Sequence, residues 1–154
     1  MVTSAPRKTN LDDPTVVGER TEAIVLAELL RLGHRVLIPF GHSHKYDLAV
    51  DLDGHLVRIQ CKTARVNRNG VIYFNSCTTR SRQSYKGVAD IFAVYCAGTT
   101  KIYFIPVMSV PDSAVSLRLS RPVNNQALKI RMASDYETLD LSLFVPTIER
   151  CSAV

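Results

Sequence analysis

Hydrophobic residues recur at helical spacing in the first part of the chain and alternate with polar residues in the parts that follow. The segment between Asp13-Pro14 and Gly33 predicts one amphipathic helix over about 14–32, because an Asp cap and a first-turn proline precede the apolar positions and a glycine ends them. The residues expected on its wide apolar face are Val17, Ile24, Val25, Leu26, Leu29 and Leu30. Short alternating or apolar runs predict strands near 34–39, 46–52, 55–63, 70–76, 90–97 and 101–106.

The remaining segments give weaker patterns. Residues 77–89 favour a loop or short helix, and the last third of the chain shows only weak strand or helix patterns near 113–119, 125–131 and 138–145. Residues 1–11 are expected to form a flexible tail. We find no internal repeat and no linker, so residues 12–150 are predicted to form a single domain.

One segment is a hairpin whose register follows from the sequence. If Asp53-Gly54 is a two-residue turn, directly opposed residues have numbers that sum to 107. Asp47 then faces Gln60. Because side chains alternate along a strand, Lys62 points to the same side as Gln60, and the side chain of Cys61 points to the other. An acid, an amide and an ammonium group are therefore expected on one patch.

The other side of this hairpin is expected to be buried. Its residues are Tyr46, Leu48, Val50, Leu52, Val57, Ile59 and Cys61. A one-residue slip in register would expose this apolar set or bury the polar one, so burial supports the derived register. The polar side has an alternative interpretation as an ordinary solvated face with cross-strand charge pairs.

Glu22 is unusual within the predicted helix. It shares the apolar side with Val25 and Leu29 at helical spacing, so its carboxylate would need a partner if the helix packs on a sheet. Helix packing beside the hairpin would direct Glu22 toward Asp47. The alternative is an acid at the helix rim that turns into solvent.

Charge is unevenly distributed along the chain, whose formal net charge is +5. No Asp or Glu occurs between Asp53 and Asp90, a stretch that also carries many amide and hydroxyl side chains. Its cations are Arg58, Lys62, Arg65, Arg68, Arg80, Arg82 and Lys86. This composition favours a polyanionic partner such as nucleic acid, and the alternative is a generally basic surface.

Length and composition further restrict the class of protein to which this chain can belong. A chain of 154 residues with 46% hydrophobic residues can bury one core. It lacks an apolar run long enough for a membrane span and an apolar leader, so we expect a cytoplasmic protein without membrane contact. The cysteines at 61, 77, 96 and 151 show no zinc spacing and are expected to be reduced. His42-x-His44 is expected to be a solvated loop that touches phosphate rather than a metal site.

The order helix, strand, strand with Gly18-x-x-x-Glu22, Asp47 and Gln60-x-Lys62 resembles the PD-(D/E)XK nuclease superfamily, in the branch of archaeal Holliday-junction resolvases and group I intron-encoded homing endonucleases. A second block, Tyr85-Lys86-Gly87-Val88-Ala89-Asp90 with the strands after it, resembles the intron-endonuclease type. The resemblance implies an α/β restriction-endonuclease-like core with a mixed central sheet flanked by helices. It also implies that residues 12–150 are one nuclease domain.

The same resemblance implies roles for individual residues. Asp47 corresponds to the metal-bridging aspartate, Glu22 to the helix carboxylate and Lys62 to the lysine that orients the attacking water. Gln60 stands where the family has its second acid, and an amide oxygen binds a hard cation without adding negative charge. The main-chain carbonyl of Cys61 is a further expected ligand. The expected cofactor is Mg²⁺, with Mn²⁺ as a substitute.

These residues predict a metal-dependent endonuclease that hydrolyses phosphodiester bonds in duplex DNA, similar to a homing endonuclease. The alternatives are a structure-selective junction resolvase and a DNA-binding relative that lost catalysis through Gln60. The expected DNA contacts are Lys45, Arg65, Arg68, Arg80, Arg82, Gln83 and Lys86. Because one active site cuts one strand, we expect a homodimer or homotetramer, with subunit contacts in the C-terminal third.

Overall fold

The computed structural model describes residues 10–41, 43–78, 81–121 and 130–145. His42, Arg80, Cys151, most of the predicted tail and most of the weak element at 125–131 lie outside the described residues. Within these ranges no helix combines the length and the apolar character needed to cross a lipid bilayer.

The N-terminal helix α1 spans Pro14–Arg31, as its pattern predicts. The Asp13 side chain accepts a hydrogen bond from the backbone N–H of Thr15, which satisfies one of the free donors in the first turn. After Leu32 the chain leaves the helix at Gly33, whose φ of 85° lies in the left-handed region. Val25 and Leu29 are buried on the inner side, so this face fixes the helix on the sheet.

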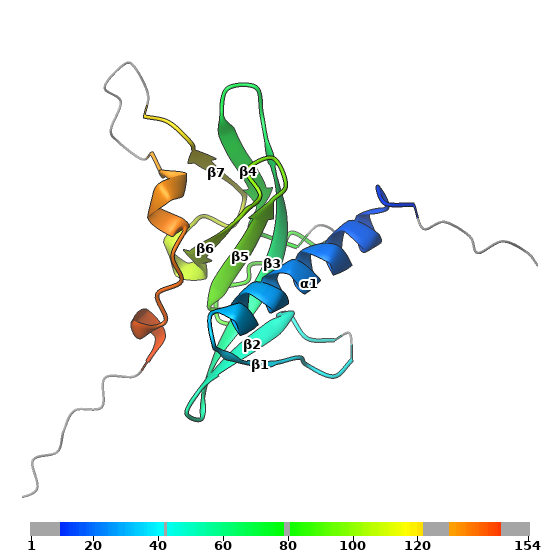
Figure 1. Cartoon of the computed structure of the whole chain (residues 1–154), viewed down its shortest axis with the longest axis vertical. Coiled ribbons are helices and arrows are strands. Elements are labelled where there is room, and N and C mark those ends of the chain that lie inside the picture. The colour runs from blue at the N-terminus through cyan, green and yellow to red at the C-terminus, as the bar shows by residue number, and fades with distance from the viewer. Residues whose placement is uncertain (1–9, 42, 79–80, 122–129, 146–154) are drawn as a thin grey trace, which may run out of the picture.

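The strands form one mixed seven-stranded sheet (Figure 1). Its strands are β1 (Arg35–Leu37), β2 (Leu48–Leu52), β3 (His55–Val66), β4 (Val71–Asn75), β5 (Ile91–Cys96), β6 (Lys101–Pro106) and β7 (Ala114–Arg118). The path β1-β2-β3-β4-β7 is antiparallel, while β5 pairs in parallel with β3 and antiparallel with β6. Short 3₁₀ helices occupy Val107–Ser109, Ala133–Tyr136 and Ser142–Phe144. The predicted α/β class with a mixed central sheet is confirmed.

The sheet separates two hydrophobic clusters. The helix-side cluster joins α1 to the sheet and contains Val25, Leu29, Leu48, Val50, Val57, Ile59, Cys61, Ile91, Ala93, Phe104 and Leu141. The opposite cluster includes Phe92, Val94, Tyr103 and Ile105, and the strands β4 and β7 add their inner side chains to it. Strand β5 alternates between the two clusters, as a strand with both faces covered must.

The β2–β3 hairpin has the register derived from its turn. Leu48 pairs with Ile59 and Leu52 with His55, so the numbers of paired residues sum to 107, as predicted. Asp53 and Gly54 have φ of 52° and 96°, which a tight turn of this hand requires. The prediction for Tyr46 is wrong: it packs against the opposite cluster, because β2 begins at Leu48 and the alternation does not extend further back.

A half-buried ion pair joins the start of β5 to β3. Arg58 Nη2 lies 2.8 Å from Asp90 Oδ1, and Asp90 Oδ2 also accepts hydrogen bonds from the Arg58 backbone N–H and Nε. Burial alone would raise the pKa of Asp90, but the hydrogen bonds and charge of Arg58 outweigh it and lower that pKa. Arg58 also donates to the carbonyl of Gly87 at 2.9 Å, so the pair fixes the end of the loop before β5.

We expect Asp90→Asn to lower the free energy of unfolding by about 1.5 kcal/mol at neutral pH, because Arg58 loses its charged acceptor. A carboxyl with a lowered folded pKa stabilises the fold above its unfolded pKa of about 4, and this stabilisation is lost as the pH falls through the folded pKa. The difference between the variant and the wild type should therefore shrink in acid. Urea unfolding at neutral pH and in acid measures this difference in the free energy of unfolding. Glu137→Gln, which alters the more exposed Lys101–Glu137 pair, is the control.

Candidate active site

Asp47 and Gln60 meet at the entrance to the β2–β3 hairpin. The backbone N–H of Asp47 donates to the carbonyl of Ile59 at 2.9 Å, which continues the ladder one residue before β2. Gln60 Nε2 lies 2.6 Å from Asp47 Oδ2, and the backbone N–H of Cys61 donates to the same oxygen at 2.7 Å. The sequence-derived register thus places these groups together, as it predicted.

Lys62 is the next polar residue on this face, and it is held by a tyrosine. Its Nζ lies 3.1 Å from the Tyr85 hydroxyl and 4.3 Å from the centre of the Tyr85 ring. The buried Tyr85 ring makes an edge contact with Phe92, with centroids 5.6 Å apart. Because Phe92 is part of β5, the central sheet fixes the position of the Lys62 ammonium group through this tyrosine.

The site lies in a partly desolvated environment. Burial raises the pKa of Asp47, although the Cys61 N–H, the Lys62 charge and the Gln60 amide oppose this change. Burial likewise lowers the pKa of Lys62, which the charge of Asp47 opposes. The acid and the ammonium therefore stabilise each other's charged forms in a site with restricted access to water.

Glu22 lies at the edge of this site. The preceding residue, Thr21, is buried and its hydroxyl lies 2.6 Å from that of Thr63, so α1 is attached to β3 beside Lys62. Glu22 itself is exposed, as the rim alternative predicted. Partial desolvation of its carboxyl raises the pKa of Glu22, and the charges of Asp47 and Glu19 raise it further, so Glu22 and Asp47 repel each other electrostatically. No hydrogen bond joins the side chains of Glu22 and Asp47, both of which are among the described residues.

The arrangement of oxygens fits a divalent cation. The Gln60 amide nitrogen, which carries partial positive charge, lies between Asp47 Oδ2 at 2.6 Å and the Cys61 carbonyl oxygen at 3.2 Å. A hard cation prefers the same two kinds of oxygen. Within the described ranges no cluster of three His, Cys, Asp or Glu side chains forms a metal site, and Gln60, in the position of the family's second acid, is not among those residue types. Rotation of the amide would add its own oxygen to the set.

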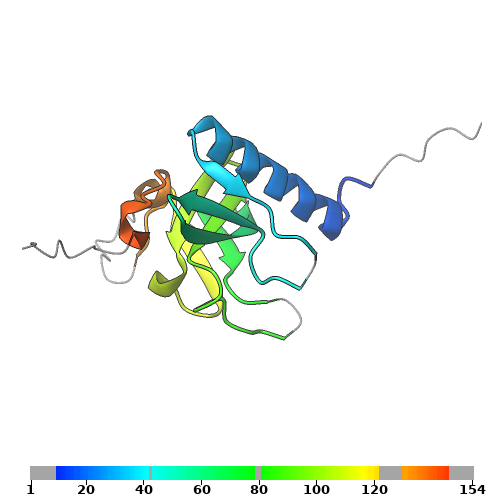
Figure 2. The ribbon, with the colours of Figure 1, turned by 90° about the horizontal axis from the view of Figure 1, so that it is seen from below.

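Two loops that border this site contact each other. The described residues of the β1–β2 loop (38–47) and of the basic loop (77–90) project to the same side of the sheet in Figure 2. Lys45 Nζ from the first donates to Gln83 Oε1 of the second at 2.9 Å. Two residues predicted to bind DNA therefore lie side by side next to Asp47.

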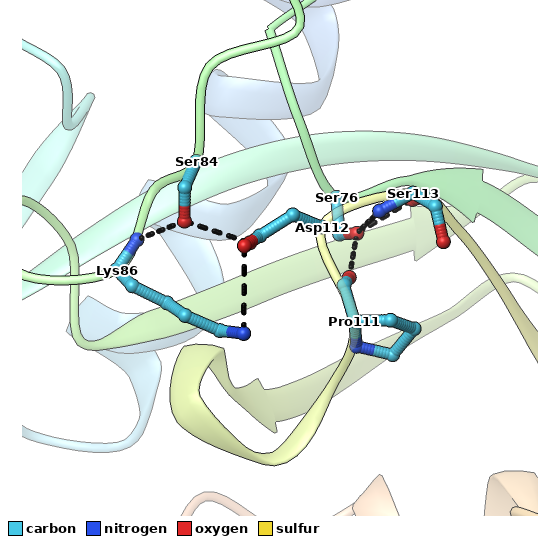
Figure 3. A network of polar contacts seen from close by, with 6 residues as sticks. All are labelled: Ser76, Ser84, Lys86, Pro111, Asp112 and Ser113. Carbon is cyan, nitrogen blue, oxygen red and sulfur yellow. Dashed lines mark hydrogen bonds and ion pairs between the residues drawn. The ribbon is translucent and has the colours of Figure 1, made fainter.

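An acidic residue outside the predicted set anchors the basic loop (Figure 3). Asp112 accepts a hydrogen bond from the Ser84 hydroxyl at 2.7 Å and lies 3.5 Å from Lys86 Nζ. Nearby, the Ser76 hydroxyl contacts the carbonyls of Pro111 and Ser113, which joins the end of β4 to the segment before β7. The loop is thus fixed at both ends, while Arg82 at its turn stays exposed.

The predicted DNA contacts fall into two groups in the structure. Lys45, Arg82, Gln83 and Lys86 belong to the two bordering loops, whereas Arg65 and Arg68 belong to the β3–β4 hairpin, which extends toward one end of the molecule (Figure 1). Sequence reasoning did not identify Tyr85 or Asp112. Tyr85 lies within the block that resembles the intron-endonuclease type, and this resemblance was a signal that could have identified it as a residue of the site.

Comparisons with known proteins identify the family of this chain and relatives of its fold. A family model described as PD-(D/E)XK endonuclease matches residues 13–139. The structure of the bacterial homing endonuclease I-Ssp6803I is similar over 80% of this chain and 86% of that chain, with a TM-score of 0.61 and 21% sequence identity. The Holliday junction resolvase Hjc of the archaeal hyperthermophile Archaeoglobus fulgidus covers 66% of this chain and 84% of its own, with a TM-score of 0.43 and 15% identity. No curated protein matches the chain.

Proposed function

The chain belongs to the PD-(D/E)XK endonuclease family, and we propose that it hydrolyses phosphodiester bonds in duplex DNA with a divalent cation held at Asp47. The convergence of Asp47 Oδ2 and the Cys61 carbonyl on the Gln60 amide nitrogen carries this proposal. It marks a position where two protein oxygens already surround partial positive charge. The fold shared with a homing endonuclease supports a similar activity for this chain.

The residues of this site would have different roles in the reaction. Asp47, the Cys61 carbonyl and the Gln60 oxygen would hold the cation, and Glu22 would add negative charge from the helix. When bound, Mg²⁺ or Mn²⁺ would supply Lewis acidity to the phosphodiester group. Lys62, held by Tyr85, would orient the attacking water and offset the negative charge that develops on the phosphate.

The bordering loops are the proposed DNA interface. Lys45 and Lys86 present ammonium groups, Arg82 an exposed guanidinium and Gln83 an amide, all suited to phosphate oxygens. Arg65 and Arg68 are proposed contacts farther along the DNA, and Arg80, which lies outside the described residues, remains a contact proposed from the sequence. Since each chain has one candidate site, cleavage of both strands favours a homodimer or homotetramer, for which the C-terminal third is the proposed contact region.

Incubation with supercoiled plasmid and Mg²⁺, in parallel with a synthetic four-way junction, tests this function. Linear plasmid with fixed ends supports a sequence-directed endonuclease, and cuts confined to the junction branch point would assign the chain to the resolvases instead. Binding to both DNAs without any cut, in Mg²⁺ and in Mn²⁺, would contradict the catalytic proposal and leave a DNA-binding relative.

Tyr85→Phe should lower kcat roughly tenfold and leave the affinity for DNA unchanged, because the hydroxyl that holds Lys62 is lost while the ring remains. Single-turnover cleavage and fluorescence anisotropy with labelled DNA separate the two quantities. Tyr73→Phe on the outer side of β4 is the matched control, since Tyr73 is exposed. An equal decrease in kcat in Tyr85→Phe and Tyr73→Phe would show that the Tyr85 hydroxyl has no role in positioning Lys62.

A further inference from the structure

The segment that leads from β1 toward Asp47 exposes a run of large apolar side chains. Leu37 is 47% exposed, Ile38 66% and Phe40 98%. Isolated exposed apolar residues are common on protein surfaces, but several close together in one loop usually mark a contact with a partner. Phe40 is nearly free of protein contacts, so its ring does not contribute to the core.

The loop that carries Phe40 makes several contacts. The carbonyl of Phe40 lies 3.1 Å from His44 Nε2, and Gly41 takes a left-handed φ of 89°. The His44 ring lies 5.7 Å from that of Tyr46, and Lys45 is bonded to Gln83 of the basic loop. The contact between Lys45 and Gln83 joins the loop that carries Phe40 to the basic loop, and both loops project to the same side of the sheet (Figure 2).

The charges around Phe40 restrict what can cover it. Residues 39–46 contain no Asp or Glu, and none occurs between Asp53 and Asp90, which includes the adjoining basic loop. A second copy of the chain docking here around a twofold axis would bring the same basic loops together. A nucleic acid instead offers phosphates to the cations and flat base surfaces to the aromatic ring.

We propose that Phe40 stacks on a base of the DNA that binds at the Asp47 site. The inference rests on the proposed function and specifies how the substrate is held there. Base–aromatic stacking tolerates any sequence, and an apolar side chain that enters a base step opens the stack locally. Phe40 would thus hold a base of the DNA beside the active site, while Lys45 of the same loop and the basic loop bind the neighbouring phosphates.

The absence of tryptophan from the chain permits a direct test. Phe40→Trp, in an Asp47→Ala background that cannot cleave, places a unique fluorophore at the contact. We expect its emission to be strongly quenched on addition of a duplex or a four-way junction. Leu143→Trp is the matched control, because Leu143 is 69% exposed and belongs to the 3₁₀ helix at the opposite side of the molecule from the β1–β2 loop (Figures 1 and 2).

Anisotropy of labelled DNA, recorded in the same titration, distinguishes failure of the inference from failure of the function. Binding accompanied by unchanged emission of the Phe40→Trp variant would overturn stacking and leave the proposed endonuclease intact, whereas no binding would overturn both. As a second measurement, Phe40→Ala and Phe40→Leu should each weaken DNA binding about tenfold, and Phe40→Tyr should retain it. Wild-type affinity in Phe40→Ala, or full retention in Phe40→Leu, would contradict a role for the aromatic ring.

Discussion

Asp47→Ala should cleave DNA at least about a thousandfold more slowly than the wild type while still binding it, because the variant lacks the oxygen on which the site converges. Asp47 Oδ2 accepts hydrogen bonds from both the Gln60 amide and the Cys61 N–H, so its removal deletes a proposed cation ligand and releases the side chain of a second one. The bordering loops, which carry the proposed phosphate contacts, do not depend on that carboxylate. Plasmid cleavage and DNA-binding anisotropy measure the two effects.

Two further variants distinguish loss of catalysis from loss of folding. Asp47→Asn preserves the size of the side chain and one acceptor oxygen, so it should fold like the wild type and remain inactive for lack of charge. Asp51→Asn, on the same strand, should keep both activity and the hydrogen bond from the Gly54 N–H that closes the turn. Near-normal cleavage by either Asp47 variant would refute the assignment of this residue, whatever the DNA affinity.

The hairpin that carries Asp47 was predictable because its constraints are local. A two-residue turn fixes the register, and alternation then determines which side chains share a face, so the contact between Asp47 and Gln60 followed from the positions of Asp53 and Gly54. The same reasoning failed at Tyr46. The alternation applies only where the strand is paired, and the chain departs from the ladder before Asp47.

Features that depend on distant segments were not predictable from the pattern. Tyr85 reaches Lys62 because β5 pairs in parallel with β3 and the loop before β5 passes over the site. The separation of Arg65 and Arg68 from the bordering loops depends on how far β3 extends, to Val66 rather than to residue 63. Composition identified a basic stretch, but only tertiary structure determines which of its cations lie together.

The orientation of the Gln60 side chain could not be predicted from the sequence either, and it predicts a large change in stability when Gln60 is replaced by glutamate. In the wild type the amide donates to Asp47 Oδ2 and to the Cys61 carbonyl, so it satisfies both acceptors when no cation is bound. Gln60→Glu replaces that donor with a second carboxylate. Without metal, the variant should therefore be less stable than the wild type by about 1–3 kcal/mol, since two acceptors lose their donor and like charges approach.

Divalent cations should reverse this order. A second charged ligand should raise the affinity for Mg²⁺ by on the order of tenfold or more, because ligand charge is a main determinant of affinity for hard cations. Binding to the folded state alone stabilises it, so Mg²⁺ should raise the Tm of Gln60→Glu more than that of the wild type. Thermal unfolding in chelator and in Mg²⁺, with isothermal titration of the metal, measures both parts.

Gln60→Ala separates loss of the donor from gain of the charge. This variant also lacks the amide that donates to Asp47, so it should be less stable than the wild type without metal. Because alanine adds no ligand, Mg²⁺ should raise its Tm less than that of the wild type. Equal metal-induced Tm shifts in the Glu, Gln and Ala variants would mean that position 60 is not a ligand. If the predicted order holds, the amide substitutes for a cation in the free protein and lowers the affinity for the metal, because a bound cation must displace a hydrogen bond that already stabilises the fold.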